Sequence, residues 1–286
     1  MAKRKPRVAL IYDFDGTLSP GNMQEYDFFP QLGMTTSQFW KESKKRAKDH
    51  DADEILAYMT LMLDKAASTD VCISKEAFAK CGKEVDLFPG VVEWFKRIDQ
   101  FAHENDVIPE HYILSSGIKE MVAGTPIAKH FKKIFASSFI YEQHGMAKAP
   151  GLAINYTTKT QFLFRINKGV LNAWDNSKIN AYQKKSDRHI PFEQMIYIGD
   201  GLTDVPCMKL TKDQGGHSIA VYKPNSPKKA TAEQLLEEQR VNFVAPADYR
   251  QGKALDLQVK AVILKIAADF EVHKLERNCK PKEKQK

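Results

Sequence analysis

The feature that most constrains the fold is a series of short apolar runs, each followed by polar residues. The first run covers Val8 to Tyr12 and stops at Asp13. A strand that is apolar at every position is typical of a parallel sheet covered by helices on both faces. Similar runs cover residues 112–114, 195–198, 218–221 and 241–244. We therefore expect five buried strands.

Helical spacing of apolar residues separates these runs. It predicts helices over residues 91–101, 168–183, 230–240 and 255–270. Strands that alternate with helices indicate an α/β fold with a doubly wound, mostly parallel sheet. Ligands of such sheets bind at the carboxyl ends of the strands, so the residues after each run are the candidate site.

A stretch without strand patterns, residues 21–87, interrupts this alternation. Ile55, Met59 and Met62 or Leu63 lie three or four residues apart, and Ser74 is a candidate N-cap for a helix that stops at Gly82. We expect a smaller, all-helical cap domain over residues 21–87, and a core over residues 8–20 and 88–273. A second insert, residues 139–164, is expected to hold a small hairpin formed by residues 156–158 and 161–164.

Charge and composition limit the classes of function. The net charge is +7, but residues 3–7 and 274–286 each contribute +4, which leaves the rest of the chain near −1. We interpret residues 1–7 and 274–286 as solvated basic tails, and binding to nucleic acid is not favoured. No apolar run has the length of a membrane span, and the four cysteines lack metal-ligand spacing, so a cytoplasmic protein with reduced cysteines is expected.

The strongest chemical signal is the segment that follows the first run, with Asp13, Asp15, Gly16 and Thr17. Side chains two apart on a strand point the same way, so the two carboxylates lie together. Such a pair is stable if a cation neutralises it, for which Mg²⁺ is suited, or if one carboxyl is protonated and can act as an acid. The turn after Asp15 offers backbone N–H groups to a phosphate. An EF-hand is excluded, because its sixth and twelfth positions are Leu18 and Gln24 here.

Two further strand ends carry polar side chains. One run ends at Ser115, Ser116 and Gly117, which suits an anion at a helix N-terminus but also a simple helix cap. Another ends at Gly199 and Asp200, and Asp204 lies one helical turn further on. Three strand ends with this chemistry, in this order, form a specific combination.

These residues resemble the motifs of the haloacid dehalogenase superfamily. The Asp-x-Asp-x-Thr motif matches residues 13–17, the strand ending in Ser matches Ser115, and Gly-Asp-x-x-x-Asp matches residues 199–204. The resemblance implies that Asp13 attacks phosphorus, that Asp15 protonates the leaving oxygen and then activates water, and that Ser115 binds phosphoryl oxygens. It also implies that Mg²⁺ is held by Asp13, the backbone carbonyl of Asp15, Asp200 and Asp204. Dehalogenases proper lack the second Asp, so Asp15 argues for phosphate chemistry.

The superfamily also has a lysine at the start of the helix before its last acidic motif. Lys168 stands where a helical pattern begins, and Lys178 lies inside that pattern. We favour Lys168, because the start of a helix faces the strand ends whereas a lysine in mid-helix is usually solvated. Its expected role is to offset negative charge on Asp13 and on the phosphoryl group.

The helical insert is similar to that of the phosphoserine phosphatase branch. That branch carries a Glu seven residues after the second Asp, where this chain has Asn22, and Glu25 lies nearby out of register. Cap charges such as Glu25, Lys45 and Arg46 are open candidates for substrate recognition. The leading hypothesis is a magnesium-dependent phosphomonoesterase for a small metabolite. The alternatives are a phosphomutase with the same nucleophile and a non-catalytic phosphate-binding protein. Neither a membrane nor an oligomeric state is indicated.

Overall fold

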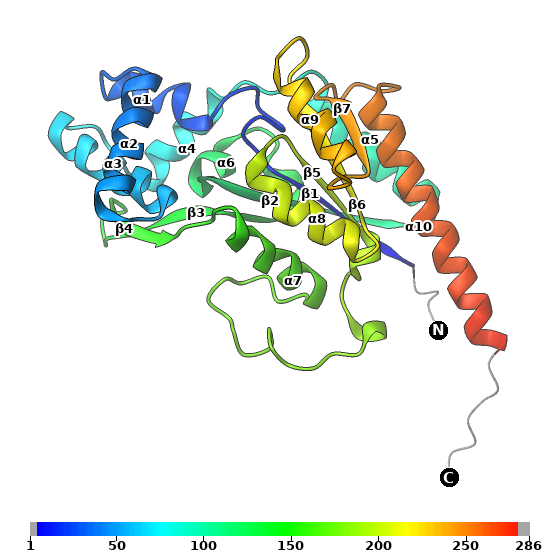
Figure 1. Ribbon diagram of the computed structural model, residues 1–286. Helices are drawn as coiled ribbons and strands as arrows, with labels where there is room; N and C mark the ends of the chain where they lie inside the picture. Colours follow the sequence, from blue (N-terminus) through cyan, green and yellow to red (C-terminus); the bar gives the residue numbers. More distant parts are fainter. Residues whose placement is uncertain (1–4, 280–286) are drawn as a thin grey trace.

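A seven-stranded sheet in the order β4-β3-β2-β1-β5-β6-β7 forms the centre of the computed structural model, which describes residues 5–279 (Figure 1). All neighbouring strands are parallel except the β3–β4 pair. The doubly wound, mostly parallel sheet is thereby confirmed. The strands are β1 (Arg7–Tyr12), β2 (Ile108–Ile118), β3 (Phe131–Tyr141), β4 (Ala147–Leu152), β5 (Met195–Gly199), β6 (His217–Tyr222) and β7 (Phe243–Pro246).

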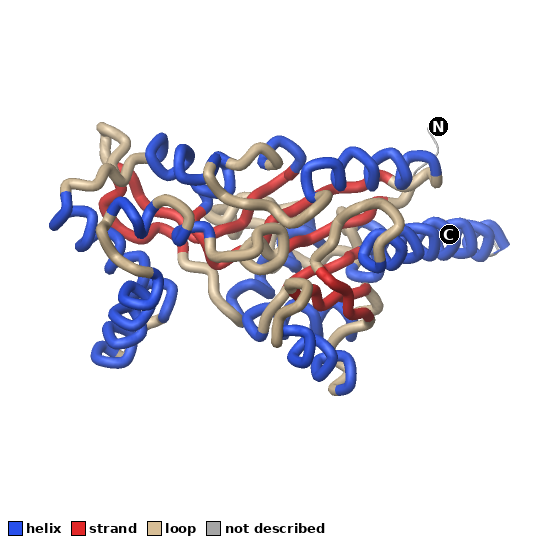
Figure 2. Tube along the Cα trace, turned by 90° about the horizontal axis from the view of Figure 1, so that it is seen from above, coloured by secondary structure: helices blue, strands red, loops and turns tan. Residues whose placement is uncertain are grey.

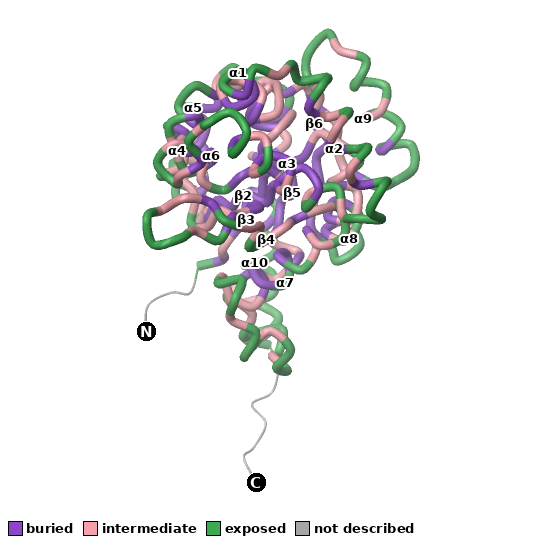
Figure 3. The backbone as a smooth tube through the Cα atoms, turned by 90° about the vertical axis from the view of Figure 1, so that its left-hand side faces the viewer, coloured by how far each residue is buried: buried purple, intermediate pink, exposed green. Residues whose placement is uncertain are grey.

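Helices cover both faces of the sheet (Figure 2). Residues of β1 alternate between two hydrophobic clusters, with Val8, Leu10 and Tyr12 in one and Ala9 and Ile11 in the other. Both faces are therefore buried, which is why this strand is apolar at every position (Figure 3). The first cluster includes α5 (Val91–Glu104), α6 (Lys119–Gly124) and α10 (Ala254–Cys279), and the second includes α7 (Thr160–Lys168), α8 (Val205–Asp213) and α9 (Lys228–Glu237).

The insert after β1 is helical throughout its described secondary structure. The prediction that Ser74 caps a helix is confirmed, since its side chain accepts a hydrogen bond from the Ala77 N–H at 3.1 Å. Ile55, Met59 and Met62 all lie in one helix, as their spacing predicts. The elements are a 3-10 helix, η1 (Met23–Glu25), and the helices α1 (Phe28–Gln31), α2 (Thr36–His50), α3 (Glu54–Thr69) and α4 (Lys75–Lys83).

The insert is joined to the core through the β3–β4 hairpin. The Ala147 N–H donates to the Ile73 carbonyl at 3.0 Å, and Phe78 of α4 stacks on Phe139 of β3 at 5.5 Å between ring centroids. The hairpin predicted from residues 156–158 and 161–164 is wrong, because this stretch forms the 3-10 helix η3 (Thr157–Lys159) and α7. Its buried residues Phe162, Leu163 and Ile166 have helical spacing and pack against the sheet.

Helix α4 is fixed to the core by close backbone packing against α6. A Cβ at Gly82 would lie 2.0 Å from the Met121 carbonyl oxygen, and a Cβ at Gly124 would lie 1.9 Å from that of Ala79. Both glycines are therefore required for the two helices to approach this closely. The α4–α6 contact joins the insert rigidly to the edge of the sheet.

The helix predicted over residues 168–183 is also wrong, because Lys168 ends α7 and does not begin a helix. Gly169 follows with φ of 72°, a left-handed conformation that terminates helices and that glycine adopts without strain. The chain then follows an irregular path to the 3-10 helix η4 (Lys185–Asp187) and to η5 (Phe192–Gln194). Arg165 holds this path by donating to the carbonyl oxygens of Asn172 and Asp175, both at 2.9 Å.

At the opposite end of the sheet from the predicted site, Glu110 of β2 is a buried carboxylate. It accepts hydrogen bonds from Arg7, Lys132 and His189 at 2.6, 2.7 and 2.9 Å. Its pKa falls to about 2, because these hydrogen bonds and that of Tyr112 outweigh the effect of burial, which acts in the opposite direction. Glu110 is therefore ionised at neutral pH.

The two predicted basic tails fall partly outside the described residues, which begin at Lys5 and end at Cys279. Lys5 forms an ion pair with Asp106 at 2.7 Å, and Arg7 is the first residue of β1. Lys274 lies within α10, the long helix that extends past the sheet in Figure 1. Arg7 and Lys274 therefore belong to regular secondary structure, whereas Lys5 precedes β1.

Candidate active site

The first strand end positions two carboxylates. Asp13 follows β1, and its N–H donates to the Ile198 carbonyl of β5 at 2.9 Å. Asp15 is held two residues later, where its Oδ1 accepts from the Met23 N–H at 2.9 Å. The turn between the first carboxylates and the insert requires Gly16, whose φ is 77° and whose Cβ would overlap the Asp200 carboxylate. The Gly16 backbone thus lies directly against the Asp200 carboxylate, which follows β5.

The strand β5 supplies the other carboxylates. Asp204 is fully buried, and its Oδ1 accepts from the Tyr197 hydroxyl at 2.7 Å, whereas its Oδ2 has no partner within the described residues. Asp200 lies at the strand end itself and forms an ion pair with Lys228 at 2.5 Å. The Lys228 side chain is 56% exposed, so this pair is easily rearranged.

Asp13, Asp200 and Asp204 form the one group among residues 5–279 that could hold a metal ion. Each offers a carboxylate oxygen, and these atoms lie within 4.8 Å of one another. The donor set contains only hard oxygen atoms, which Mg²⁺ prefers, and the unpartnered Oδ2 of Asp204 leaves a buried acceptor for it. The residues therefore fit a magnesium ion. Asp15 is directed to the Met23 N–H, and its side chain is not one of the three.

A buried lysine lies between two of these carboxylates, and it is Lys159. Its Nζ is 2.7 Å from Asp204 Oδ1 and 3.2 Å from Asp13 Oδ1, and its side chain is 1% exposed. Burial pulls the pKa of Lys159 down, but Asp13 and Asp204 raise it on balance above its ordinary value. Lys159 is therefore a fixed positive charge in the site.

The prediction that Lys168 occupies this position is wrong. The Nζ of Lys168 donates to the carbonyl oxygens of Ile179 and Ala181, at 2.5 and 2.8 Å, and so supports the irregular segment after α7. Lys178, the alternative, is exposed. The error follows from the misplaced helix: the lysine precedes the true start of α7 at Thr160, whereas the helix was expected to start eight residues later, at Lys168.

Burial and mutual repulsion shift the protonation of the first two carboxyls. Burial, followed by the Asp204 carboxylate, raises the pKa of Asp13 well above its usual range, against the effect of Lys159. Burial raises the pKa of Asp15 to about 7, although the Met23 N–H lowers it. Asp15 therefore holds or releases a proton near neutral pH, as a general acid and base must do.

The residues expected to bind phosphoryl oxygens surround the same place. The hydroxyls of Thr17 and Ser116 are buried without a hydrogen-bond partner within the described residues, which leaves them open to a ligand. Ser115 instead accepts from the Gly117 N–H at 2.9 Å. Gly117 closely borders Asp15, since a Cβ there would lie 3.0 Å from the Asp15 Oδ2.

A chamber of about 140 Å³ lies between Asp15 and the helices of the insert. Tyr58 of α3 closes it against the core, because its hydroxyl donates to the Ser116 carbonyl at 2.7 Å. The wall contains residues from η1, α2, α3 and the end of β2, namely Asn22, Gln24, Trp40, Ser43, Lys44, Glu54, Ile55, Tyr58, Ser116 and Gly117. Sequence patterns did not single out Trp40 or Tyr58.

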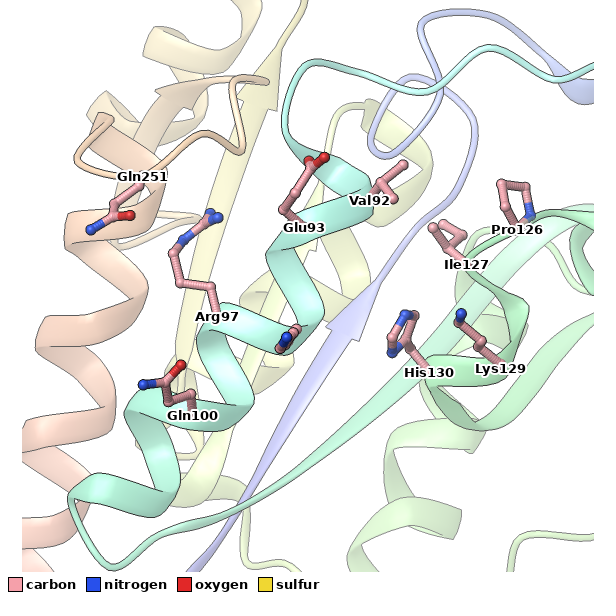
Figure 4. A pocket seen from close by; sticks show the side chains of 10 residues that line it. Val92, Glu93, Arg97, Gln100, Pro126, Ile127, Lys129, His130 and Gln251 are labelled. Carbon is pink, nitrogen blue, oxygen red and sulfur yellow. The ribbon is translucent and has the colours of Figure 1, made fainter.

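A larger hollow of about 540 Å³ lies elsewhere, beside α5 (Figure 4). Its wall includes Lys96, Lys129 and His130, but none of the strand-end carboxylates. Arg97, which also borders it, is engaged with Asp256 at 3.0 Å. Size alone therefore does not identify the site, and the acidic strand ends do.

The sequence model of the haloacid dehalogenase-like hydrolase family matches residues 10–209, more than half of the chain. The matched range contains every strand-end carboxylate and Lys159. The chain belongs to this family.

Other haloacid dehalogenase-like proteins share its fold. A HAD family hydrolase from Salmonella enterica subsp. enterica serovar Typhi has a TM-score of 0.57 at 17% identity, over 90% of this chain and 72% of that one. A phosphoserine phosphatase, solved as an analogue of its phospho-aspartyl intermediate, has a TM-score of 0.53 at 16% identity, over 90% and 99%. An uncharacterized protein from Borreliella burgdorferi is 28% identical over 282 residues, or 89% of this chain and 96% of the other. The phosphoserine phosphatase thus resembles this family member in fold over nine-tenths of the chain.

No helix within residues 5–279 combines the length and apolar character that crossing a membrane requires.

Proposed function

We propose that this chain is a magnesium-dependent phosphomonoesterase that acts on a small phosphorylated metabolite through an aspartyl-phosphate. The observation that carries the proposal is the placement of Asp13, with a buried lysine 3.2 Å from one oxygen and Asp15 two residues away. The phosphoserine phosphatase of similar fold, which was solved as a phospho-aspartyl analogue, supports the same chemistry.

In the proposed reaction, a carboxylate oxygen of Asp13 forms a bond to phosphorus as the bond from phosphorus to the ester oxygen breaks. Asp15 gives its proton to that ester oxygen, which leaves as an alcohol. Asp15 then accepts a proton from water, whose oxygen attacks phosphorus and releases phosphate from Asp13. Lys159 keeps its charge throughout and offsets the negative charge that gathers near Asp13.

The other residues bind or enclose the substrate. The free hydroxyls of Thr17 and Ser116 donate to phosphoryl oxygens, and Ser115 orients the Gly117 N–H. Mg²⁺, when held by Asp13, Asp200 and Asp204, would neutralise charge on the phosphoryl group. The insert excludes bulk water during transfer, and a chamber of about 140 Å³ admits only a small leaving group.

The test compares Asp13→Asn with Asp15→Asn on p-nitrophenyl phosphate and on an alkyl phosphate. Asp13→Asn should abolish turnover of both esters and the phosphorylated protein seen by mass spectrometry after acid quenching. Asp15→Asn should lower turnover of the alkyl phosphate by about two to four orders of magnitude, and that of the activated ester less, because nitrophenolate leaves without a proton.

Free phosphate released in proportion to ester lost separates the phosphatase from a phosphomutase. Substantial activity in Asp13→Asn would contradict the covalent mechanism. Activity that survives removal of divalent ions with EDTA would contradict the role of magnesium.

A further inference from the structure

The chamber beyond Asp15 has an acidic and aromatic wall. Glu25 of η1 accepts from the Trp40 indole N–H at 3.0 Å and from the Asn22 amide at 2.5 Å. Glu54 at the start of α3 lines the chamber and accepts from the Tyr156 hydroxyl at 3.2 Å. Glu54 and Trp40 thus line the chamber, whereas Glu25 is not part of its wall and supports it through the hydrogen bond to Trp40.

The positive charges near the chamber lie outside its interior. Lys44 is the one basic residue of the wall, and it is exposed. Lys159 lies between Asp13 and Asp204, on the side of the phosphoryl group. No arginine lines the chamber. The part of the substrate that enters this space therefore meets negative charge, which disfavours a carboxylate or a second phosphate.

An unpartnered acceptor points to the same kind of ligand. Gln24 lines the chamber and is 2% exposed, yet its Oε1 has no hydrogen-bond partner within the described residues. A buried acceptor costs free energy unless a donor reaches it, and an ammonium N–H is a strong donor.

We infer that the substrate is the phosphomonoester of a short primary amino alcohol, whose ammonium group binds among Glu54, Trp40 and the Gln24 oxygen. The inference rests on the proposed function and names its substrate class. An ammonium next to carboxylates and aromatic rings gains from charge and from the ring faces. The chamber of about 140 Å³ is smaller than the roughly 300–1,000 Å³ typical of ligand pockets, which favours a short leaving group. A quaternary ammonium lacks the N–H that Gln24 requires.

The first test compares kcat/KM for four esters that differ at one end. We expect phosphoethanolamine to exceed ethylene glycol monophosphate, which has a hydroxyl in place of the ammonium, by at least about tenfold. Phosphocholine and phosphoserine should also be poorer, because the former has no N–H and the latter adds a carboxylate. Equal values for the first two esters, or a preference for either of the others, would overturn the inference.

The second test uses matched variants. Glu54→Gln should reduce the ratio of kcat/KM between phosphoethanolamine and the hydroxyl analogue by at least about tenfold, chiefly through KM. Glu42→Gln, on the exposed surface of α2 and paired with Lys65, should keep the wild-type ratio. If phosphoserine is preferred and Lys44→Ala removes that preference, the chamber reads a carboxylate and the inference is wrong.

A binding measurement separates this inference from the proposed function. In Asp13→Asn, calorimetry should give a lower Kd for phosphoethanolamine than for ethylene glycol monophosphate. Wild-type hydrolysis of p-nitrophenyl phosphate without any preference for the amine refutes only the substrate class. Failure to hydrolyse any ester, including p-nitrophenyl phosphate, refutes the proposed function and with it this inference.

Discussion

Replacement of Lys159 by Met gives the sharpest test of the site, because the structure and the sequence pattern selected different lysines. Methionine has a similar length and keeps the packing of a side chain that is 1% exposed. Among residues 5–279, it removes the one buried positive charge beside Asp13 and Asp204, whose oxygens lie 3.2 and 2.7 Å from the Lys159 Nζ. The variant therefore leaves two buried carboxylates that repel each other.

The expected loss of stability in Lys159→Met follows from those two contacts. Loss of one partner from a buried ion pair destabilises a protein by about 3–5 kcal/mol, because the remaining charge stays desolvated. Part of this loss should return when Mg²⁺ is added, since the cation offsets the same carboxylates. Loss of a preorganised charge in a closed site should also lower kcat by at least about a hundredfold, even where Mg²⁺ restores the fold.

The assay combines urea unfolding, with and without Mg²⁺, and turnover of p-nitrophenyl phosphate at saturating Mg²⁺. Lys168→Met is the matched control, because the Lys168 ammonium group donates to the backbone carbonyls of Ile179 and Ala181 and not to a strand-end carboxylate. It should retain kcat and lose no more than about 1–2 kcal/mol of stability. If Lys159→Met keeps kcat within about threefold of wild type while Lys168→Met loses it, the assignment of the lysine is wrong.

Three further predictions address stability and the metal. Glu110→Gln should lower the free energy of unfolding at pH 7 by about 1–3 kcal/mol. The pKa of Glu110 is depressed from 4.5 to about 2, so its ionised form stabilises the fold above about pH 4.5. The difference in unfolding free energy between variant and wild type should therefore vanish as pH falls towards 2. A constant difference from pH 7 to 2 would contradict this account. Gly82→Ala should cost about 1–3 kcal/mol in urea unfolding, because its Cβ would overlap the Met121 carbonyl, whereas Gly201→Ala, whose Cβ meets nothing within 3.7 Å, should not. Mg²⁺ should raise the Tm of the wild-type protein, since it relieves repulsion among the strand-end carboxylates; calorimetry that shows no shift at millimolar Mg²⁺ would argue against metal binding there.

The parts of the fold that sequence could predict are those in which burial dictates composition. The strand Val8 to Tyr12 is apolar at each position because both faces of the sheet are covered, and β5 repeats the pattern. Their carboxyl ends are neighbours in the sheet, so Asp13 and Asp200 had to lie close together. The strand β3 was missed because its residues Phe131 to Tyr141 mix lysines and serines with apolar side chains, as suits a strand that is covered less completely.

Lys159 could not be identified from the sequence pattern of helix starts, because α7 begins without a capping side chain. No side chain caps this helix, and a 3-10 turn that ends at Lys159 leads directly into Thr160. Gly169 ends α7, whereas the helix predicted over residues 168–183 places this glycine near its beginning. The residues of the chamber wall could not be predicted from sequence periodicity either, because Trp40 and Glu54 line the same chamber only when α2 and α3 pack together.

The close backbone contact with α6 distinguishes α4 from the other helices of the insert. With two glycines in backbone contact, α4 behaves as an extension of the sheet edge, and sliding it would force carbonyl groups into each other. The pair α2 and α3 is held over the chamber by buried side chains such as Phe39 and Met59, together with the hydrogen bonds of Tyr58 to Ser116 and of Tyr156 to Glu54. The helices α2 and α3 that line the chamber are thus fixed by side-chain contacts, whereas the glycines of α4 and α6 fix α4 through its backbone.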